Sequence, residues 1–262
     1  MLLLAQLAIG SPSMQCRASP RSLLSWLVSR GLRHDVAMIH PVPPTLMPVL
    51  EAVPARQSAF GWNRDVWFAQ LRDRPDVVDA LTALEDRVDR HTTAAFVLAE
   101  LNNDRVLSAF TAAMVWGYGL AGYGPSRLRR VLTGVGGSRS RDAAVRPDIA
   151  DRLLGAVSVV REQGPVEAYS YMYGTGRIKY LGGAYFTKWL YFVSAVDGPD
   201  TPAAAPILDK RVAVWLNANI ALRLRVDRTE SYRLYYGLLG EWGRQFGRTR
   251  PQVEQAIFEL TR

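Results

Sequence analysis

Apolar side chains recur at helical spacing through most of the chain after Gly61. Between Val77 and Val88, for example, Leu81 and Leu84 continue an apolar stripe, and Asp and Arg occupy the positions between. Steps of three and four residues place side chains on one face of an α-helix. No stretch alternates apolar and polar residues over the length of a strand. We therefore predict an all-α protein with roughly ten helices of ordinary length.

Glycine and proline divide the helical pattern into segments. One helix is predicted to start at Asp104, a second to run from Ile149 to Arg161 and a third to start at Pro165. The last predicted helix follows Thr249, which is a good N-cap residue. The segment 134–141 is rich in Gly, Ser and Arg and is the strongest internal break. We predict that it forms an exposed loop.

The first part of the chain has a different composition. Prolines interrupt residues 1–56, which we predict to be a partly irregular N-terminal arm, although Ser19–Pro20 could start one short helix that ends near Arg30. Residues 57–262 are then the main domain. The apolar start, Met1–Ile9, has nine residues and is too short to span a bilayer. We expect no association with a membrane.

Charge and cysteine content restrict the function further. The chain of 262 residues has a net charge of +8 and a sequence pI near 9.9, which favours a polyanionic partner. A genome that prefers arginine codons would give the same balance. Cys16 is the only cysteine, so an intramolecular disulfide and a four-cysteine metal site are excluded. The three histidines lack ligand spacing. We expect a monomer without metal or cofactor in a reducing cytoplasm.

One segment has features of an anion-binding turn. Leu181–Ala184 contains two glycines that permit a tight turn between helices, and Arg177 and Lys179 precede it. The free N–H groups at the start of the following helix would suit a phosphate. A plain connection between two helices explains the same glycines equally well.

Lys188 lies in an apolar setting, between Phe186 and Trp189. Such a lysine can extend along apolar surface to reach water. It can also be a nucleophilic amine, provided that burial or a proton acceptor keeps part of it neutral.

Asp209 is the candidate partner of Lys188, 21 residues further along the chain (209 − 188 = 21). It precedes an apolar helix and is therefore also a good N-cap residue. The two roles are compatible, because a carboxylate at the start of a helix is held in place and its negative charge is stabilised.

These residues resemble the helix-hairpin-helix DNA glycosylases, specifically the 8-oxoguanine glycosylase branch. In that family the hairpin ends in Thr-Lys before an apolar helix, and the catalytic Asp follows some twenty residues later. Thr187–Lys188 and Asp209 match this pattern. A second segment, 116–125 with the arginines after it, resembles a block in bacterial OGG-fold proteins, some of which are thought to act on modified bases in phage DNA. The resemblance implies two helical lobes with a cleft between them and a hairpin at about 177–192.

The segment also departs from the family pattern. The turn reads Gly-Gly-Ala, and Phe186 stands where the family has its second hairpin glycine. The usual Val-Asp-x-His becomes Leu208-Asp209-Lys210-Arg211. The aspartate is kept while its neighbours become basic.

The resemblance implies catalytic roles for Lys188 and Asp209 and a set of DNA contacts. The expected contacts to the DNA backbone are Arg127, Arg129, Arg130, Arg177, Lys179, Gly182, Gly183, Tyr185 and Thr187. The aromatic candidates for the base pocket or for a wedge in the duplex are Trp62, Trp116, Tyr118, Tyr123 and Trp242, and Asn63 or Glu230 could read a base edge.

The predicted function is a DNA N-glycosylase that extrudes and excises a modified base and leaves an abasic site. We favour anti-phage defence against hypermodified cytosine, such as glucosylated hydroxymethylcytosine. An 8-oxoguanine repair glycosylase with AP lyase activity is the first alternative. A non-catalytic DNA-binding module and a helical scaffold for protein partners are the others.

Overall fold

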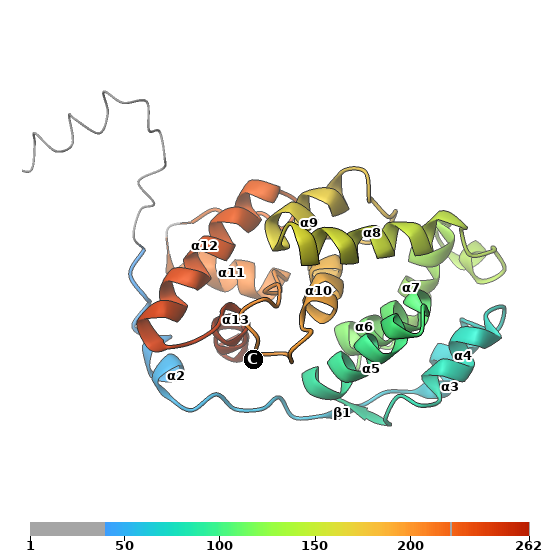
Figure 1. The fold of residues 1–262 in the computed structure, drawn as a ribbon, viewed down its shortest axis with the longest axis horizontal. Coiled ribbons are helices and arrows are strands. Elements are labelled where there is room, and N and C mark those ends of the chain that lie inside the picture. Colours follow the sequence, from blue (N-terminus) through green and yellow to red (C-terminus); the bar gives the residue numbers. More distant parts are fainter. Residues whose placement is uncertain (1–39, 221, 262) are drawn as a thin grey trace, which may run out of the picture. The chain divides into compact units, whose positions relative to one another are not determined.

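The computed structural model describes residues 40–220 and 222–261. These residues form twelve α-helices and one two-stranded antiparallel sheet, in which β1 (Phe60–Gly61) pairs with β2 (Arg87–Val88). The prediction of an all-α protein is confirmed (Figure 1). None of the described helices is both long and apolar enough to cross a bilayer.

The helices of the first half are α2 (Met47–Glu51), α3 (Arg64–Ala69), α4 (Pro75–Leu81), α5 (Arg90–Asn102), α6 (Val106–Tyr118), α7 (Gly124–Thr133) and α8 (Asp148–Glu162). The second half contains α9 (Pro165–Tyr173), α10 (Gly183–Ser194), α11 (Lys210–Asn219), α12 (Thr229–Phe246) and α13 (Arg250–Glu259). A short 3-10 helix, Ser138–Arg141, lies within the segment that was predicted to be a loop. Its Ser140 is buried, whereas Ser138, Arg139 and Arg141 are exposed, as predicted for this segment.

The compact unit starts earlier than the sequence indicated. Pro41–Arg262 forms one unit, and α2 packs on α13. Leu46 and Leu50 are fully buried there, and Pro48 lies in the first turn of α2, where a proline does not interrupt a helix. Residues 41–56 therefore belong to the folded unit and not to an arm. The arm and short helix predicted for residues 1–39 lie outside the described residues.

The helix predicted across Val77–Val88 is wrong in its second half. Helix α4 ends at Leu81, and Val88 lies in β2. The guanidinium of Arg64 donates hydrogen bonds to the carbonyl oxygens of Thr82 and Leu84. These carbonyls therefore have partners without a continuing helix, and the apolar side chains of Leu84 and Val88 are still buried.

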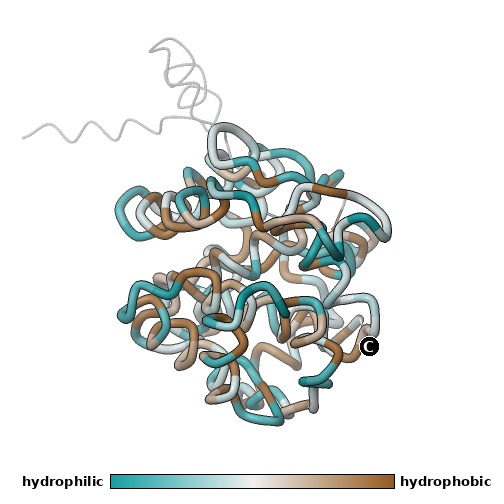
Figure 2. Tube along the Cα trace, turned by 90° about the vertical axis from the view of Figure 1, so that its right-hand side faces the viewer, coloured by the Kyte–Doolittle hydropathy of each residue, from teal (hydrophilic) through white to brown (hydrophobic). Residues whose placement is uncertain are grey.

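Helix α10 is the central helix of the fold. It packs on α5, α6, α8 and α9 (Figure 1). Its residues Phe186, Trp189 and Leu190 are fully buried. A helix that is apolar all around its surface is expected in the interior. Other helices alternate hydrophobic and hydrophilic residues along their length (Figure 2). Helices α11, α12 and α13 form a second group, in which α13 contacts both of the others.

The connection before α10 differs from the predicted tight turn. Residues 174–182 separate α9 from α10, and the positive φ in this connection belongs to Tyr180, at 69°, while Gly182 has a φ of −88°. Gly183 is required for a different reason. A Cβ at this position would overlap the carbonyl oxygen of Val226. Close approach of two backbones, not turn geometry, explains this glycine.

Candidate active site

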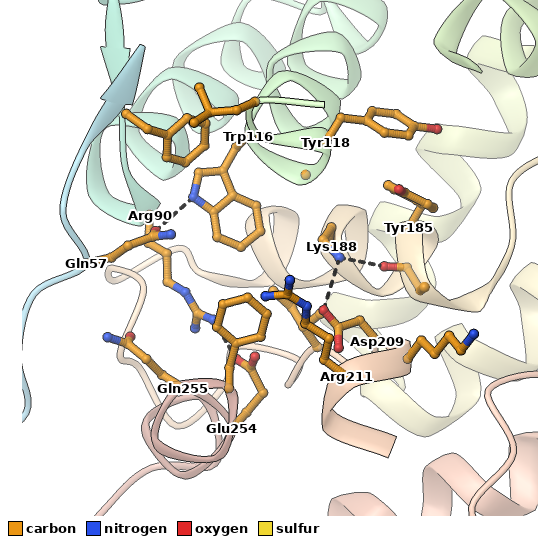
Figure 3. A pocket seen from close by; sticks show the side chains of 18 of the residues that line it. Gln57, Arg90, Trp116, Tyr118, Tyr185, Lys188, Asp209, Arg211, Glu254 and Gln255 are labelled. Atoms are coloured by element: carbon orange, nitrogen blue, oxygen red, sulfur yellow. Dashed lines mark hydrogen bonds and ion pairs between the residues drawn. The ribbon is translucent and has the colours of Figure 1, made fainter. Parts of the chain in front are cut away.

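A cavity of about 840 Å³ lies between α5, α6, α10, α11 and α13 (Figure 3). The segment before β1 also contributes to its wall. Among the residues that line it are Gln57, Phe60, Arg90, Trp116, Tyr118, Tyr185, Lys188, Asp209, Glu254 and Phe258. This volume falls in the upper part of the range of small-molecule sites, roughly 300–1,000 Å³.

Lys188 is buried on α10, with 8% of the residue exposed, and reaches the cavity. Its Nζ donates a hydrogen bond to the carbonyl oxygen of Ala184 at 3.0 Å and lies 3.8 Å from Oδ2 of Asp209. The ring centroid of Tyr185 is 5.1 Å from the same nitrogen. The structure thus brings the predicted amine and carboxylate together at one cavity.

The electrostatic environment favours the neutral form of Lys188. Burial lowers the pKa of its ammonium group, and the positive charge of Arg90 acts in the same direction. The carboxylates of Asp209 and Glu254 oppose this effect, but the pKa of Lys188 remains below its ordinary value. A larger neutral fraction makes the amine a better nucleophile.

Asp209 is the N-cap of α11. Its Oδ1 accepts a hydrogen bond from the backbone N–H of Val212 at 3.0 Å. This bond holds one carboxylate oxygen, while the other faces Lys188. The positive end of the helix dipole stabilises a negative charge at this place. The position suits a carboxylate that must stabilise a developing cation.

Aromatic side chains line the cavity next to Lys188 and Asp209. Tyr118 stacks on Tyr185 with 4.2 Å between ring centroids and 27° between planes. Burial, with a contribution from Tyr123, raises the pKa of the Tyr185 hydroxyl to about 12, so this group is neutral near pH 7. Trp116 donates from Nε1 to Oε1 of Gln57 at 2.9 Å. Trp116, Tyr118 and Tyr123 therefore lie at the cavity, where a base pocket was expected.

Four other candidates for the base pocket, the wedge or contact with a base edge lie elsewhere. Trp62 donates to the carbonyl oxygen of Glu85, and Asn63 caps α3. Trp242 is fully buried in α12, and Glu230 lies in the first turn of that helix. None of these four residues lines the cavity. Burial removes Trp242 as a contact for a base, whereas the roles of Trp62, Asn63 and Glu230, which are partly or fully exposed, stay predictions.

The residues predicted to contact the DNA backbone fall into an exposed group and a buried group. Arg127, Arg177 and Lys179 are exposed, and Gly182 is exposed at the start of α10. Thr187 is fully buried and donates from Oγ1 to the carbonyl oxygen of Gly183, which is itself buried. Contact of these two buried residues with DNA is inconsistent with the structure.

Arg129 is a structural residue. Its guanidinium is buried and donates from Nη1 and Nη2 to the carboxylate of Asp73 at 2.6 and 2.9 Å. It also donates to the carbonyl oxygens of Ser140 and Ala143. It therefore anchors the segment after α7 and is not available to a phosphate. Arg130, next to it, is half-buried.

The structure adds functional candidates that sequence reasoning missed. Arg90 and Glu254 form an ion pair at the cavity, with Nη2 and Oε2 2.8 Å apart. Leu120 lines the rim of the cavity and is 81% exposed. Gly119 before it has a φ of 57°. The position of Leu120 between glycines was a sequence feature that could have indicated an exposed apolar residue. Arg90 and Glu254 are 164 residues apart, and no local sequence pattern connects them.

A mostly helical fold with a buried amine and a carboxylate at one large cavity is compatible with a DNA glycosylase. A comparison with protein families agrees at this level. Residues 53–258 match the family described as "Putative 8-oxoguanine DNA glycosylase OGG-like protein", and the chain belongs to this family. DNA is the substrate that the family description implies. Searches of curated proteins and of solved structures gave no match.

Proposed function

We propose that this protein is a DNA N-glycosylase that uses Lys188 and Asp209 to excise a modified base from an extruded nucleotide. The observation that supports this proposal is the 3.8 Å approach of the buried amine to a carboxylate at the wall of the large cavity. Binding of DNA without chemistry would need neither a desolvated lysine nor a carboxylate held against it.

Exposed residues around the cavity support the proposed extrusion of the nucleotide. Removing a base from the stack costs a few kcal/mol, which contacts in the pocket and a wedge in the duplex can offset. Leu120 is the candidate wedge, because it is exposed at the rim. Arg127, Arg177 and Lys179 are exposed cations for the phosphates. Their contribution would weaken as salt increases.

The first version of the mechanism uses Lys188 as the nucleophile. The neutral amine attacks C1′, and the glycosidic bond breaks with its electron pair passing to the base, which takes up a proton. Asp209 stabilises the positive charge that develops on the sugar and accepts the proton that the amine loses. Opening of the sugar ring then gives a Schiff base, from which β-elimination expels the 3′ phosphate.

The second version uses water. Asp209 activates a water molecule that attacks C1′, and Lys188 only positions the sugar. The product is then an intact abasic site, without strand cleavage. The two versions differ in whether a covalent enzyme–DNA intermediate forms.

The size of the cavity favours a bulky base. At about 840 Å³ it leaves room for a substituent beyond a normal base. We therefore infer a hypermodified cytosine, such as glucosylated hydroxymethylcytosine, and a role in defence against phage DNA. The family description supports 8-oxoguanine as the second candidate, with AP lyase activity in the first version of the mechanism.

The decisive experiment incubates the purified protein with duplexes that contain cytosine, glucosylated hydroxymethylcytosine or 8-oxoguanine and measures abasic sites. Release of one modified base is expected. The variant Asp209→Asn should abolish release under both versions. Failure to release any base would instead favour the non-catalytic DNA-binding module.

Borohydride trapping separates the two versions. The chain has three lysines, and Lys188 is the buried one, while Lys179 and Lys210 are exposed. Under the first version Lys188→Gln abolishes trapping, whereas Lys179→Gln, which removes one cation at the DNA surface, still traps when the protein saturates the DNA. Release that survives in Lys188→Gln but not in Asp209→Asn selects the second version. Full activity in both variants would reject both.

A further inference from the structure

A second buried ion pair lies at the same cavity and is not used in the chemistry above. Arg90 comes from α5 and Glu254 from α13, and their side chains are 6% and 2% exposed. Both residues line the cavity, on a different part of its wall from Asp209 (Figure 3). Only the folded chain brings these two charges together.

Stability does not explain the pair. Removing two charges from water has a desolvation cost that often cancels their attraction, and well-packed apolar residues commonly replace such pairs without loss. The hydrogen bonding of the Arg90 guanidinium is also incomplete. Its Nη1 is buried and has no hydrogen-bond partner among the residues that the structure describes. A buried donor without an acceptor is unfavourable unless a ligand completes it.

The guanidinium is nevertheless held in one place. Its central carbon lies 5.5 Å from the ring centroid of Trp116 and 5.0 Å from that of Tyr191. Glu254 holds it from a third direction through Nη2. At the cavity wall the guanidinium of Arg90 is a rigid hydrogen-bond donor, and the carboxylate of Glu254 next to it is an acceptor. The two together complement a ligand that has an acceptor and a donor side by side on one edge.

Resting on the proposed function, we propose that Arg90 and Glu254 read the hydrogen-bonding edge of the extruded base and select a cytosine-type base over a uracil-type base. Glu254 would accept a hydrogen bond from the exocyclic N4 amine. Arg90 would donate to N3 and O2. Carboxylates commonly accept from the cytosine amine in nucleic-acid recognition. These three atoms do not include C5, so the interaction is compatible with a large substituent there.

A uracil-type base meets two repulsive contacts in the same orientation. Its O4 would face the carboxylate oxygen of Glu254, and its N3–H would face the N–H groups of Arg90. A site built to hydrogen-bond one pattern rejects the other because its buried polar groups are then left unpaired. The pair therefore acts as a specificity determinant that is separate from Lys188 and Asp209.

The test uses the full-length protein and two duplexes that differ only at position 4 of one base, 5-hydroxymethylcytosine and 5-hydroxymethyluracil. Both kcat/KM for base release and Kd are measured for each duplex. The wild-type protein should prefer the cytosine-type base by roughly 10- to 100-fold. The variant Glu254→Gln presents an amide that can donate to O4, so this ratio should fall toward one.

A matched control lies on the same helix. Glu259 also lines the cavity, and its carboxylate accepts from Gln255. The variant Glu259→Gln should keep the wild-type ratio. Thermal melting monitors folding of each variant, and Arg90→Lys, which keeps the charge but loses the planar fork, provides a second variant with the same expected loss of preference.

The outcomes distinguish this inference from the proposed function. An unchanged preference in folded Glu254→Gln and Arg90→Lys, or release of 8-oxoguanine with equal treatment of the two pyrimidines, overturns the inference while the glycosylase activity stands. A Kd ratio that depends on Glu254 in the absence of any base release supports the inference and rejects the glycosylase. Equal Kd values reject the inference, and they reject the glycosylase as well only when the duplexes with glucosylated hydroxymethylcytosine and 8-oxoguanine also show no release.

Discussion

The stem of Lys188 occupies the space that a side chain at position 117 would fill. A Cβ at Gly117 would lie 2.8 Å from Cδ of Lys188, closer than such carbons approach in proteins. Gly117 lies within α6, and the lysine enters from α10. The glycine therefore leaves a path along which the amine reaches Asp209.

We expect Gly117→Ala to displace the amine and to reduce kcat. A displacement near 1 Å can cost about 100-fold in rate, and KM should change little because the DNA-binding surface is intact. Single-turnover kinetics and borohydride trapping measure the effect. Gly122→Ala is the control, because a Cβ there meets nothing within 4 Å. Equal rates for both variants would show that Gly117 does not position the lysine.

The protonation of Lys188 should depend on its charged neighbours. Burial lowers its pKa, so the titration midpoint should lie below the ordinary lysine value of 10.5, and the nucleophilic amine should increase as pH rises through that midpoint. Because the Asp209 carboxylate favours the ammonium form, Asp209→Asn should move the midpoint lower still. Carbon-13 NMR of labelled lysine side chains measures both shifts without catalysis. A midpoint that rises in Asp209→Asn contradicts this account.

The approach of α10 to the segment before α12 should depend on Gly183. We expect Gly183→Ala to destabilise the fold by roughly 1–3 kcal/mol, because the new Cβ would overlap the carbonyl oxygen of Val226. Gly182→Ala should have a much smaller effect, since that position is open and its φ of −88° suits alanine. Denaturant unfolding compares the two. Similar losses would mean that turn flexibility, rather than close approach, is what matters.

Leu120 should matter only when a base must leave a duplex. We expect Leu120→Ala to reduce base release from duplex DNA by roughly 10-fold, consistent with the few kcal/mol that extrusion costs. Release from single-stranded DNA should be nearly unchanged, because no stack has to be opened. Leu234→Ala on α12 replaces another exposed leucine and is the control. A parallel loss on both substrates would indicate a pocket role for Leu120.

Two arginines of α7 should behave differently although they are two residues apart. Arg129→Gln should cost roughly 1–3 kcal/mol of stability, because it leaves Asp73 and the carbonyl oxygens of Ser140 and Ala143 without their donor. Arg127→Gln should leave stability within about 0.5 kcal/mol and reduce the salt dependence of DNA binding by about one counterion. Thermal melting and salt titrations test the pair. A larger loss of stability in Arg127→Gln than in Arg129→Gln would contradict these roles.

Local sequence rules determined much of the helical fold. Asp209 caps α11 through a hydrogen bond across three residues, and the backbone N–H of Thr249 donates to the Gln252 side chain over the same separation, so both helix starts were predictable from the chain alone. The start of α9 at Pro165 follows from the same short-range rules. The apolar residues on both sides of Lys188 also predicted its apolar setting, and the structure buries this residue on α10.

Tertiary packing decided the rest, because it depends on partners that are distant in sequence. It separated Trp116, which lines the cavity, from Trp242, which is buried in α12, although both are tryptophans on helices. It ended α4 early by supplying Arg64 to the carbonyls of the next turn. It also placed Arg90 against Glu254 across 164 residues. Helical periodicity specifies which face of a helix is apolar, but the distance between two charges depends on how those faces pack.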